Sequence, residues 1–320
     1  MQAYSPQLAR AFALWEAGRT AESILAFTQL AAQNDPVALA TLGELKWRGG
    51  VMPQDSAQGR ELFRRAGEAG HAPSAAIATN LLASGIAGPR DWPAALERLR
   101  KEGRTDARRR QALSLLDKMK LTKNGDPKSL PAGERVSESP EVTVYRGLFS
   151  AAECDYLRQM AEPGYQPSFV YDSAGRPLRD TIRTSDGSTI HWQIEDPAVH
   201  ALNRRLAATS GTGYDQGESL QILRYRPGEQ YHPHFDYVED SDNQRILTAL
   251  VYLNQDYEGG ETCFVKTGLK VKGRKGDAVV FRNAAPDGRI DPLAEHAGLP
   301  VTSGIKYLAS RWICERRWVP

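Results

Sequence analysis

Cysteine is scarce in this chain of 320 residues. Its three cysteines, Cys154, Cys263 and Cys314, are odd in number and far apart, and none belongs to a CxxC pair. Structural zinc sites and dithiol redox centres depend on such pairs, and disulfide frameworks depend on an even set of cysteines. We therefore exclude these classes of protein and expect three free thiols.

Long apolar runs and a strong excess of one charge are also missing. No run approaches the ~20 apolar residues that span a bilayer, and the first residues lack a basic segment followed by an apolar one, as in a secretory leader. Forty-one Lys and Arg residues oppose 39 Asp and Glu residues, which leaves a formal charge of +2. We expect a cytoplasmic protein with no membrane partner, and nucleic acid is not expected as its main partner.

The composition that remains is that of a globular protein, with 41% hydrophobic and 25% charged residues. At ~100–200 residues per domain, this length predicts two or three domains. Over residues 1–118 the apolar positions recur at helical spacing, whereas residues 141–320 contain short β-rich segments separated by turn residues. Residues 119–140 contain three prolines and few large apolar side chains, so we expect a linker or an arm there.

The helical half contains an internal repeat. A shift of 36 residues aligns Gly49 with Gly85 and Asp55 with Asp91. The pattern of small residues, a glycine-containing loop and a capping Asp resembles Sel1-like repeats, relatives of the tetratricopeptide hairpin, in two clear copies and a degenerate one over residues 5–35. Such hairpins stack and leave a concave surface for protein contact. The alternative is a helical cap that only shields the second domain.

A basic run over residues 98–110 has seven Lys and Arg side chains in thirteen positions. It is compatible with a patch for an acidic partner, but a run of this kind is more often a solvated helix face. Both interpretations stay open at this point.

The second half contains strand patterns and two helix signals. Ser150 with Glu153 forms a capping box that begins a helix through about Ala161, and a second helix begins after Asp196. Strands are predicted at 142–148, 220–226, 245–254, 261–265, 277–281 and 304–315. Short strands at this spacing indicate a sandwich or barrel, of which a jelly roll is the natural candidate. The expected fold class is α+β multidomain.

One group of metal-ligand residue types is dense. The segment YHPHFDY contains His232, His234 and Asp236, and His296 follows sixty residues later. In an extended segment, residues two apart project to the same side, so His234 and Asp236 can bind one ion and a third ligand must come from another strand. Two imidazoles and one carboxylate are the ligand set of non-haem Fe(II) oxygenases. An HxD pair alone also occurs by chance around a structural histidine.

The segments LRYRPGEQYHPHFDY, RILTALVYLN, GGETCF, GDAVVF and EHAGLPVTSGIKYLASRWI together resemble the prolyl 4-hydroxylase branch of the 2-oxoglutarate/Fe(II)-dependent dioxygenases. The resemblance implies a double-stranded β-helix (jelly roll) with flanking helices over residues 141–320, with its core at 218–316. It makes His234, Asp236 and His296 the iron ligands. It makes Lys306 the partner of the distal 2-oxoglutarate carboxylate.

The resemblance also assigns roles around this centre. Tyr225 would hydrogen-bond the cosubstrate, and Thr262 would line the cosubstrate pocket. Arg245 would be a catalytic-site residue near the substrate channel, although a salt-bridged position on the rim is an equal alternative. Arg183 would follow a mobile loop, here residues 170–184, whose Gly, Pro and charged residues suit a lid.

The residues themselves support the role of Lys306. An unpaired ammonium inside an apolar strand loses several kcal/mol of hydration, and a dicarboxylate would supply the missing partner. By strict alternation Lys306, Leu308, Ser310 and Trp312 share one face, so Trp312 can lie along the same pocket wall or pack in the core. The remaining histidines have no partners at ligand spacing and are expected to be structural or exposed: His71, His191, His200 and, on the rim, His232.

The resemblance implies an Fe(II)- and 2-oxoglutarate-dependent dioxygenase that consumes O₂, with L-ascorbate keeping the iron reduced. The implied substrate is peptidyl proline in a protein or peptide, which the helical repeats could hold. Two alternatives stay open: an oxygenase of the same fold that acts on a small molecule, and a catalytically silent helical-repeat adaptor. The complete ligand set with Lys306 argues against the adaptor.

Overall fold

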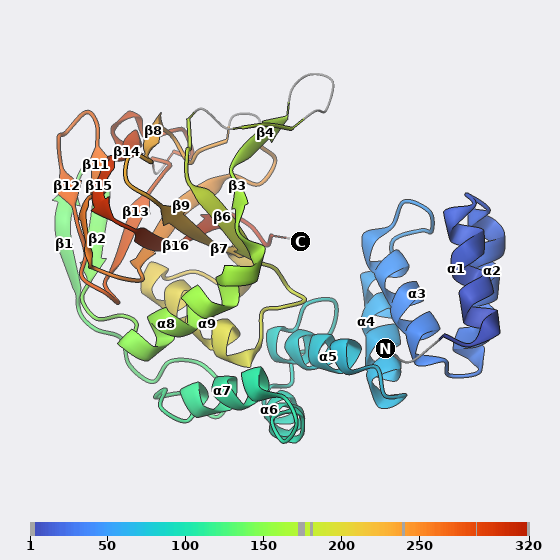
Figure 1. Ribbon diagram of the computed structural model, residues 1–320. Helices are drawn as coiled ribbons and strands as arrows, with labels where there is room; N and C mark the ends of the chain where they lie inside the picture. Colours follow the sequence, from blue (N-terminus) through green and yellow to red (C-terminus); the bar gives the residue numbers. More distant parts are fainter. Residues whose placement is uncertain (1–3, 172–176, 180–181, 239–240, 286, 319–320) are drawn as a thin grey trace. The chain divides into compact units, whose positions relative to one another are not determined.

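The structure is a computed structural model that describes residues 4–171, 177–179, 182–238, 241–285 and 287–318 (Figure 1). The chain divides into two compact units. The first, here called the helical unit, comprises the chain up to Leu116 together with Trp192–His200. The second, the β unit, comprises Asp117–His191 and Ala201–Pro320. The boundary near residue 116 lies close to the one expected from the sequence, but the separate segment 192–200 was not expected.

The helical unit is a succession of short helices in which each packs against the next (Figure 1). Most of them begin at a residue whose side chain caps the first turn, as with Asp35 before Pro36 and Asp55 before Ser56. The helices are α1 (Pro6–Glu16), α2 (Thr20–Ala32), α3 (Pro36–Arg48), α4 (Ser56–Glu68), α5 (Ala72–Ser84), α6 (Trp92–Glu102) and α7 (Ala107–Leu116).

The hairpins α3–α4 and α5–α6 each have the same pattern of hydrogen bonds in the loop between their helices. Asp55 and Asp91 accept from the backbone N–H three residues further on, at 2.9 and 3.0 Å. Their own backbone N–H groups donate to the carbonyl oxygens of Lys46 and Leu82, at 2.8 and 2.9 Å. These bonds recur at the offset seen in the sequence, so the repeated residues build the same loop twice.

The segment Trp192–His200 completes the core of the helical unit. The Trp192 ring stacks on Trp47 with centroids 3.9 Å apart, and both belong to a cluster with Phe63 and Leu81. The segment therefore covers an apolar face that α3, α4 and α5 build together.

The basic run over 98–110 is largely used in internal bonds. Arg109 is buried and donates to Glu102 and Asn80, at 2.7 and 2.9 Å. Lys101 pairs with Glu97 on the surface of α6. Two of its seven cations are thus paired with carboxylates of the same unit, and Arg98 and Arg110 donate to neutral oxygens there.

The β unit contains two larger sheets, in which every observed pairing of described strands is antiparallel. The eight-stranded sheet has the order β1-β2-β13-β9-β16-β7-β6-β3, and the four-stranded sheet has the order β12-β11-β14-β8. The pairs β10-β15 and β4-β5 are separate. The strands are β1 (Gly133–Glu138), β2 (Glu141–Tyr145), β3 (Gln166–Pro167), β4 (Phe169–Tyr171), β5 (Pro177–Arg179), β6 (Asp186–Ile190), β7 (Leu220–Tyr225), β8 (Tyr231–His234), β9 (Arg245–Tyr252), β10 (Tyr257–Gly259), β11 (Thr262–Phe264), β12 (Lys270–Val271), β13 (Ala278–Arg282), β14 (His296–Gly298), β15 (Val301–Gly304) and β16 (Lys306–Cys314).

This arrangement is consistent with the jelly roll that the sequence favours, and its core lies between the two sheets. Aromatic and branched side chains from both sheets fill it, among them Tyr252 and Phe281 from the larger and Phe264 from the smaller. The helices α8 (Ala151–Ala161) and α9 (Pro197–Ser210) flank the larger sheet (Figure 1). Arg311 of β16, for example, donates to the carbonyl oxygen of Asn203 at 2.9 Å.

Most of the strong sequence signals are observed. All six predicted strands are present, and the capping box of Ser150 and Glu153 begins α8. The stretch 119–140 is more ordered than a linker, because Gly133–Glu138 forms β1, which pairs with β2. The cysteines are free thiols, as expected. Within the described ranges, every helix is too short or too polar to cross a membrane.

One glycine of the β unit supports a close approach of two backbone segments. Gly276 has a φ of 93°, and a Cβ there would lie 2.0 Å from the carbonyl oxygen of Phe149. Gly288 has a similar φ of 81°, but no atom of the described residues lies within 4 Å of its Cβ position. We expect Gly276→Ala to lower the free energy of unfolding by about 1–3 kcal/mol more than Gly288→Ala, because only the first adds a clash to the backbone strain. Urea unfolding of both variants measures this, and equal losses would contradict it.

Candidate metal centre

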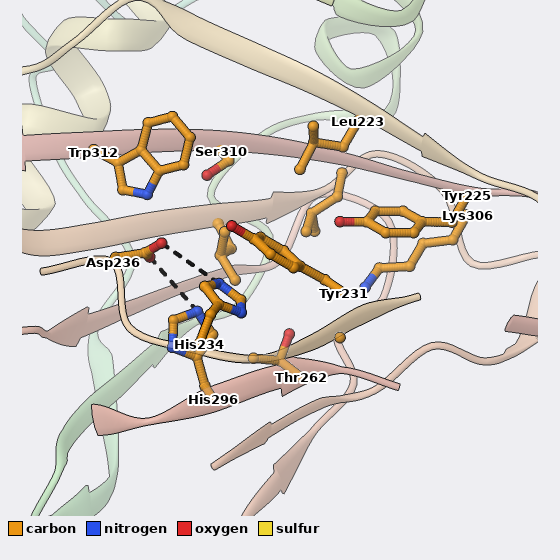
Figure 2. Close-up of a pocket in the computed structure, with 13 residues that line it drawn as sticks. Leu223, Tyr225, Tyr231, His234, Asp236, Thr262, His296, Lys306, Ser310 and Trp312 are labelled. Atoms are coloured by element: carbon orange, nitrogen blue, oxygen red, sulfur yellow. Dashed lines mark ion pairs between the residues drawn. The ribbon is translucent and has the colours of Figure 1, made fainter. Parts of the chain in front are cut away.

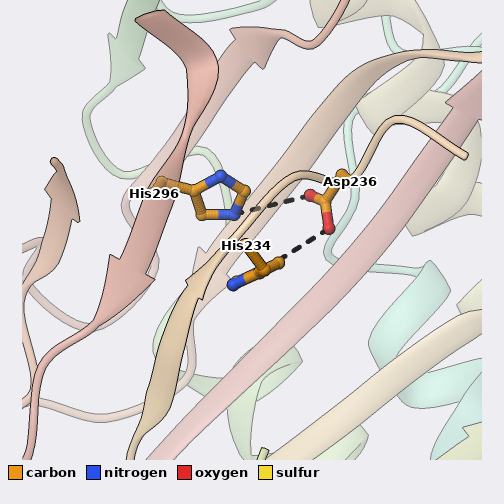
Figure 3. Close-up of side chains that lie close together, drawn as sticks. All are labelled: His234, Asp236 and His296. Atoms are coloured by element: carbon orange, nitrogen blue, oxygen red, sulfur yellow. Dashed lines mark ion pairs between the residues drawn. The ribbon is translucent and has the colours of Figure 1, made fainter. Parts of the chain in front are cut away.

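Three potential metal ligands converge at the edge of the smaller sheet. His234 is the last residue of β8, Asp236 follows two residues later, and His296 begins β14. In the antiparallel pairing of these strands His296 lies opposite His234. One ligand atom from each side chain lies within 4.8 Å of the others (Figure 3). The expectation that a third ligand comes from another strand to join an HxD pair therefore agrees with the geometry.

Backbone carbonyl groups fix the orientation of both imidazoles. The Nδ1 atom of His234 lies 2.8 Å from the carbonyl oxygen of His232, and that of His296 lies 3.0 Å from the carbonyl oxygen of Ala294. A carbonyl oxygen only accepts, so each Nδ1 carries the proton and each Nε2 presents a lone pair. Both Nε2 atoms lie 3.6 Å from the Asp236 carboxylate.

The protonation states of Asp236 and His296 suit a cation. Burial would raise the pKa of Asp236, but the two imidazoles and a hydroxyl group outweigh it, and the pKa lies well below its usual value. Burial lowers the pKa of His296 to about 4. At neutral pH the centre therefore contains one carboxylate and a neutral His296, as divalent transition metals require of their ligands.

A second layer of polar groups positions the carboxylate. The hydroxyl group of Thr248 donates to Asp236 Oδ2 at 2.6 Å, and Asn283 Nδ2 donates to the same hydroxyl group at 2.9 Å. Because Asn283 donates, the single proton of Thr248 is directed to Asp236. Sequence reasoning missed both residues. A polar Thr inside the apolar run RILTALVYLN was the one available signal for Thr248.

A pocket extends from these ligands between the two sheets. Figure 2 shows the His234, Asp236 and His296 side chains toward one end and Lys306 with Tyr225 toward the other. The lining comprises Leu223, Tyr225, Tyr231, His234, Asp236, Leu250, Thr262, His296, Gly298, Lys306, Leu308, Ser310 and Trp312. The face of β16 predicted by alternation, from Lys306 to Trp312, is the one that lines the pocket.

Lys306 is a buried cation at the end of the pocket away from the ligands. It is 2% exposed, and its Nζ donates to the carbonyl oxygen of Gly260 at 2.8 Å. The rings of Tyr225 and Tyr252 lie 5.2 and 5.7 Å from Nζ. Among the described residues no carboxylate forms an ion pair with it. Burial lowers the pKa of Lys306 to about 8, so its charge is only weakly maintained.

The two residues expected around the cosubstrate also line the pocket. Tyr225 is buried and lies directly opposite Lys306 in the pairing of β7 with β16. Thr262 is buried on β11, and its hydroxyl group lies 3.2 Å from that of Tyr252. Tyr231, which the sequence did not single out, stacks on His234 with ring centroids 3.4 Å apart.

Arg245 lies beside the pocket and does not line it. Its guanidinium group forms two bonds to Glu218, at 2.5 and 2.9 Å, and lies 3.9 Å from the ring centroid of Trp312. Its surroundings therefore match the alternative of a salt-bridged residue at the rim. Arg245 could affect a substrate only through its contact with Trp312.

The other candidates are not part of the pocket lining. His232 is exposed and outside the ligand cluster, as expected, although its carbonyl oxygen orients His234. Arg183 donates to the Ser168 hydroxyl group at 2.9 Å. The expected lid over 170–184 includes the paired strands β4 and β5, and its residues 172–176 and 180–181 lie outside the described residues.

Comparisons with known proteins find relatives of the part of the chain that contains this site. The model of the 2OG-Fe(II) oxygenase superfamily matches residues 220–314. Prolyl 4-hydroxylase 1 of Arabidopsis thaliana is 37% identical over 203 residues, which are 57% of this chain and 72% of that protein. Probable prolyl 4-hydroxylase 3 of Arabidopsis thaliana is 35% identical over 205 residues, 56% of this chain and 71% of that protein. The crystal structure of the viral collagen prolyl hydroxylase vCPH from Paramecium Bursaria Chlorella virus-1 in its 2OG complex is 29% identical, with a TM-score of 0.42, and covers 54% of this chain and 95% of that one.

The bond from Thr248 to Asp236 gives a test of the second layer. We expect Thr248→Val to weaken Co²⁺ binding about 10–100-fold, because the variant keeps the side-chain shape but leaves the carboxylate without its orienting donor. Titration calorimetry of the metal-free protein measures the affinity. Thr302→Val, an exposed position on β15, is the matched control and should bind Co²⁺ normally. Unchanged affinity in Thr248→Val would show that Asp236 does not need this donor.

Proposed function

Because this chain belongs to the 2OG-Fe(II) oxygenase superfamily, with prolyl 4-hydroxylases as its relatives, we propose that it hydroxylates proline residues within a protein or peptide. The chain is a 2-oxoglutarate-dependent dioxygenase that uses Fe(II), 2-oxoglutarate and O₂. The observation that carries the proposal is one pocket with a His-Asp-His cluster toward one end and a buried lysine toward the other.

We propose His234, Asp236 and His296 as the iron ligands. Two directed Nε2 lone pairs and one carboxylate form the donor set that leaves coordination positions open on Fe(II). When bound, Fe(II) supplies the oxidative chemistry in which 2-oxoglutarate and O₂ yield succinate and CO₂, and one oxygen atom enters a substrate C–H bond. The protein orients these ligands through hydrogen bonds. The His232 and Ala294 carbonyl groups hold the two imidazoles, and the Thr248 hydroxyl group holds the carboxylate.

Lys306 is proposed to bind the distal carboxylate of 2-oxoglutarate. A buried ammonium whose hydrogen bond goes to a neutral carbonyl oxygen is poorly compensated, and a carboxylate would complete its surroundings. Tyr225 is proposed to donate a hydrogen bond to the same molecule and Thr262 to contact it, because both line the pocket.

Trp312 is proposed to contact the substrate. Its side chain is buried along the pocket, and its Nε1 has no acceptor among the described residues. An unused N–H donor in a largely apolar pocket suits a peptide carbonyl group. The stacked Arg245, held by Glu218, is proposed to position the indole ring.

The remaining expectations belong to the same proposal. They are a Sel1-like character of residues 1–118, a role of the helical unit in holding the protein substrate, a cytoplasmic location and L-ascorbate as the reductant of the iron. The hydrogen bonds that recur between the hairpins α3–α4 and α5–α6 support the first. A cavity among α2, α3 and α4 is relevant to the role of the helical unit in holding a protein.

The proposed reaction is tested with a proline-containing peptide, Fe(II), 2-oxoglutarate and ¹⁸O₂. We expect succinate and a hydroxyproline that carries one ¹⁸O atom, measured by mass spectrometry. His234→Ala, Asp236→Ala and His296→Ala should each abolish both products, because each removes one of three protein ligands. Label in free proline to the same extent as in the peptide would contradict a protein substrate, and turnover in any of the three variants would remove that residue from the metal centre.

The role of Lys306 is tested by its pH dependence. The charged form binds a carboxylate, so kcat/KM for 2-oxoglutarate should fall as the pH rises through about 8, the pKa of Lys306. Lys306→Ala should raise KM for 2-oxoglutarate at least about tenfold at pH 7, because a buried carboxylate loses its partner. It should also lose the decline near pH 8. Lys270→Ala, at an exposed lysine on β12, should retain both the low KM and the decline.

A further inference from the structure

The helical unit contains a second cavity, which the metal centre does not share. It has a volume of about 320 Å³ and lies among α2, α3 and α4. Side chains of Ala31, Leu42, Met52 and Leu62 give it an apolar floor. This volume is within the ~300–1,000 Å³ typical of ligand pockets and can hold a large aliphatic side chain.

Polar and cationic side chains complete the lining of this cavity. Thr28 and Gln58 are neutral, and Lys46 and Arg65 are cations. Among the residues that the structure describes, no Asp or Glu lines it. The surface around the apolar floor is therefore positive.

Arg65 and Lys46 have no carboxylate partner among the described residues, unlike the neighbouring Arg64 and Arg48. Arg65 donates to two neutral oxygens, the carbonyl of Ala31 at 3.3 Å and the side chain of Asn34 at 3.0 Å. Among the described residues, neither Arg65 nor Lys46 forms an ion pair with a carboxylate. By contrast, the adjacent Arg64 is paired with two glutamates on α4, and Arg48 with one on α3. Arg64 and Arg48 are thus neutralised by carboxylates of their own helices, whereas the two cations of the cavity are not.

The apolar surface continues beyond the cavity. Leu25 is 59% exposed and lies on α2 one and two turns before Thr28 and Ala32, on the same helix face. Val51, in the loop that also contains Met52, is 50% exposed. By contrast, the face of the helical unit around Trp47 is covered by the segment of the chain that contains Trp192.

We propose that this cavity, with Lys46 and Arg65, binds a partner protein through a segment in which an aliphatic side chain stands beside Asp or Glu. The aliphatic side chain fills the space above Leu42 and Leu62. The carboxylate pairs with Lys46 and Arg65, which have no such partner in the described part of the unit. The proposal does not rest on the proposed hydroxylase activity.

The test uses a random heptapeptide library displayed on phage and the full chain as target. Selected peptides should be enriched several-fold in Asp or Glu adjacent to Leu, Ile or Met. A selected peptide labelled with fluorescein is then titrated by fluorescence anisotropy. We expect the double variant Lys46→Glu with Arg65→Glu to bind it at least tenfold more weakly.

Two further variants make the result specific. Ala32→Trp keeps both cations and places a large ring at an exposed position of the cavity, so it should also lose binding. Arg100→Glu with Lys101→Glu reverses the same number of charges on α6 and should bind as the wild type does. The proposal is overturned if the selected peptides lack the acidic and aliphatic pattern. It is equally overturned if Ala32→Trp and the Lys46/Arg65 variant, with unchanged melting temperatures, bind as tightly as the wild type.

Discussion

The antiparallel pairing of β14 with β8 is the constraint on which the metal centre depends. It places His296 opposite His234, although sixty-one residues of chain separate them. Side chains alternate between the faces of a strand, so a slip of one residue would turn one imidazole away from the other. The strand β11 holds β14 from its other side, with Phe264 opposite His296. The position of one ligand is thus set by two neighbouring strands.

The pocket separates two buried charges of opposite sign. Asp236 is surrounded by imidazoles and the Thr248 hydroxyl group, whereas Lys306 is surrounded by tyrosine rings and a carbonyl oxygen. A structural ion pair would bring such charges together. Here the two charges are held apart, and under the proposed function each would be matched by the opposite charge of a ligand, a metal dication at one end and a dicarboxylate at the other. Burial lowers the pKa of Lys306, whereas the imidazoles and the Thr248 hydroxyl group outweigh burial at Asp236 and keep its pKa low.

Features that depend on local patterns could be predicted from the sequence. The strands β7, β9, β13 and β16 are continuous apolar or alternating runs, and the HxD motif needs only an extended segment to bring its two side chains together. The assignment of His296 as the third ligand and of Lys306 as a cosubstrate residue depended on the resemblance to prolyl 4-hydroxylases. Thr248 and Asn283 were missed because their role exists only once β9 and β13 pair. The position of the Arg245 side chain depends on its ion pair with Glu218, and no local sequence pattern links these two residues.

The stacking of Trp192 on Trp47 has a consequence for synthesis of the chain. A ribosome completes all seven helices of the helical unit long before it reaches residue 192, so the apolar face around Trp47, Phe63 and Leu81 stays open to water during translation of the intervening strands. Final closure of this N-terminal core therefore waits for a part of the chain encoded well into the β unit. The order of folding is not the order of synthesis, and a nascent chain interrupted before that point presents an adhesive surface to chaperones or to other nascent chains.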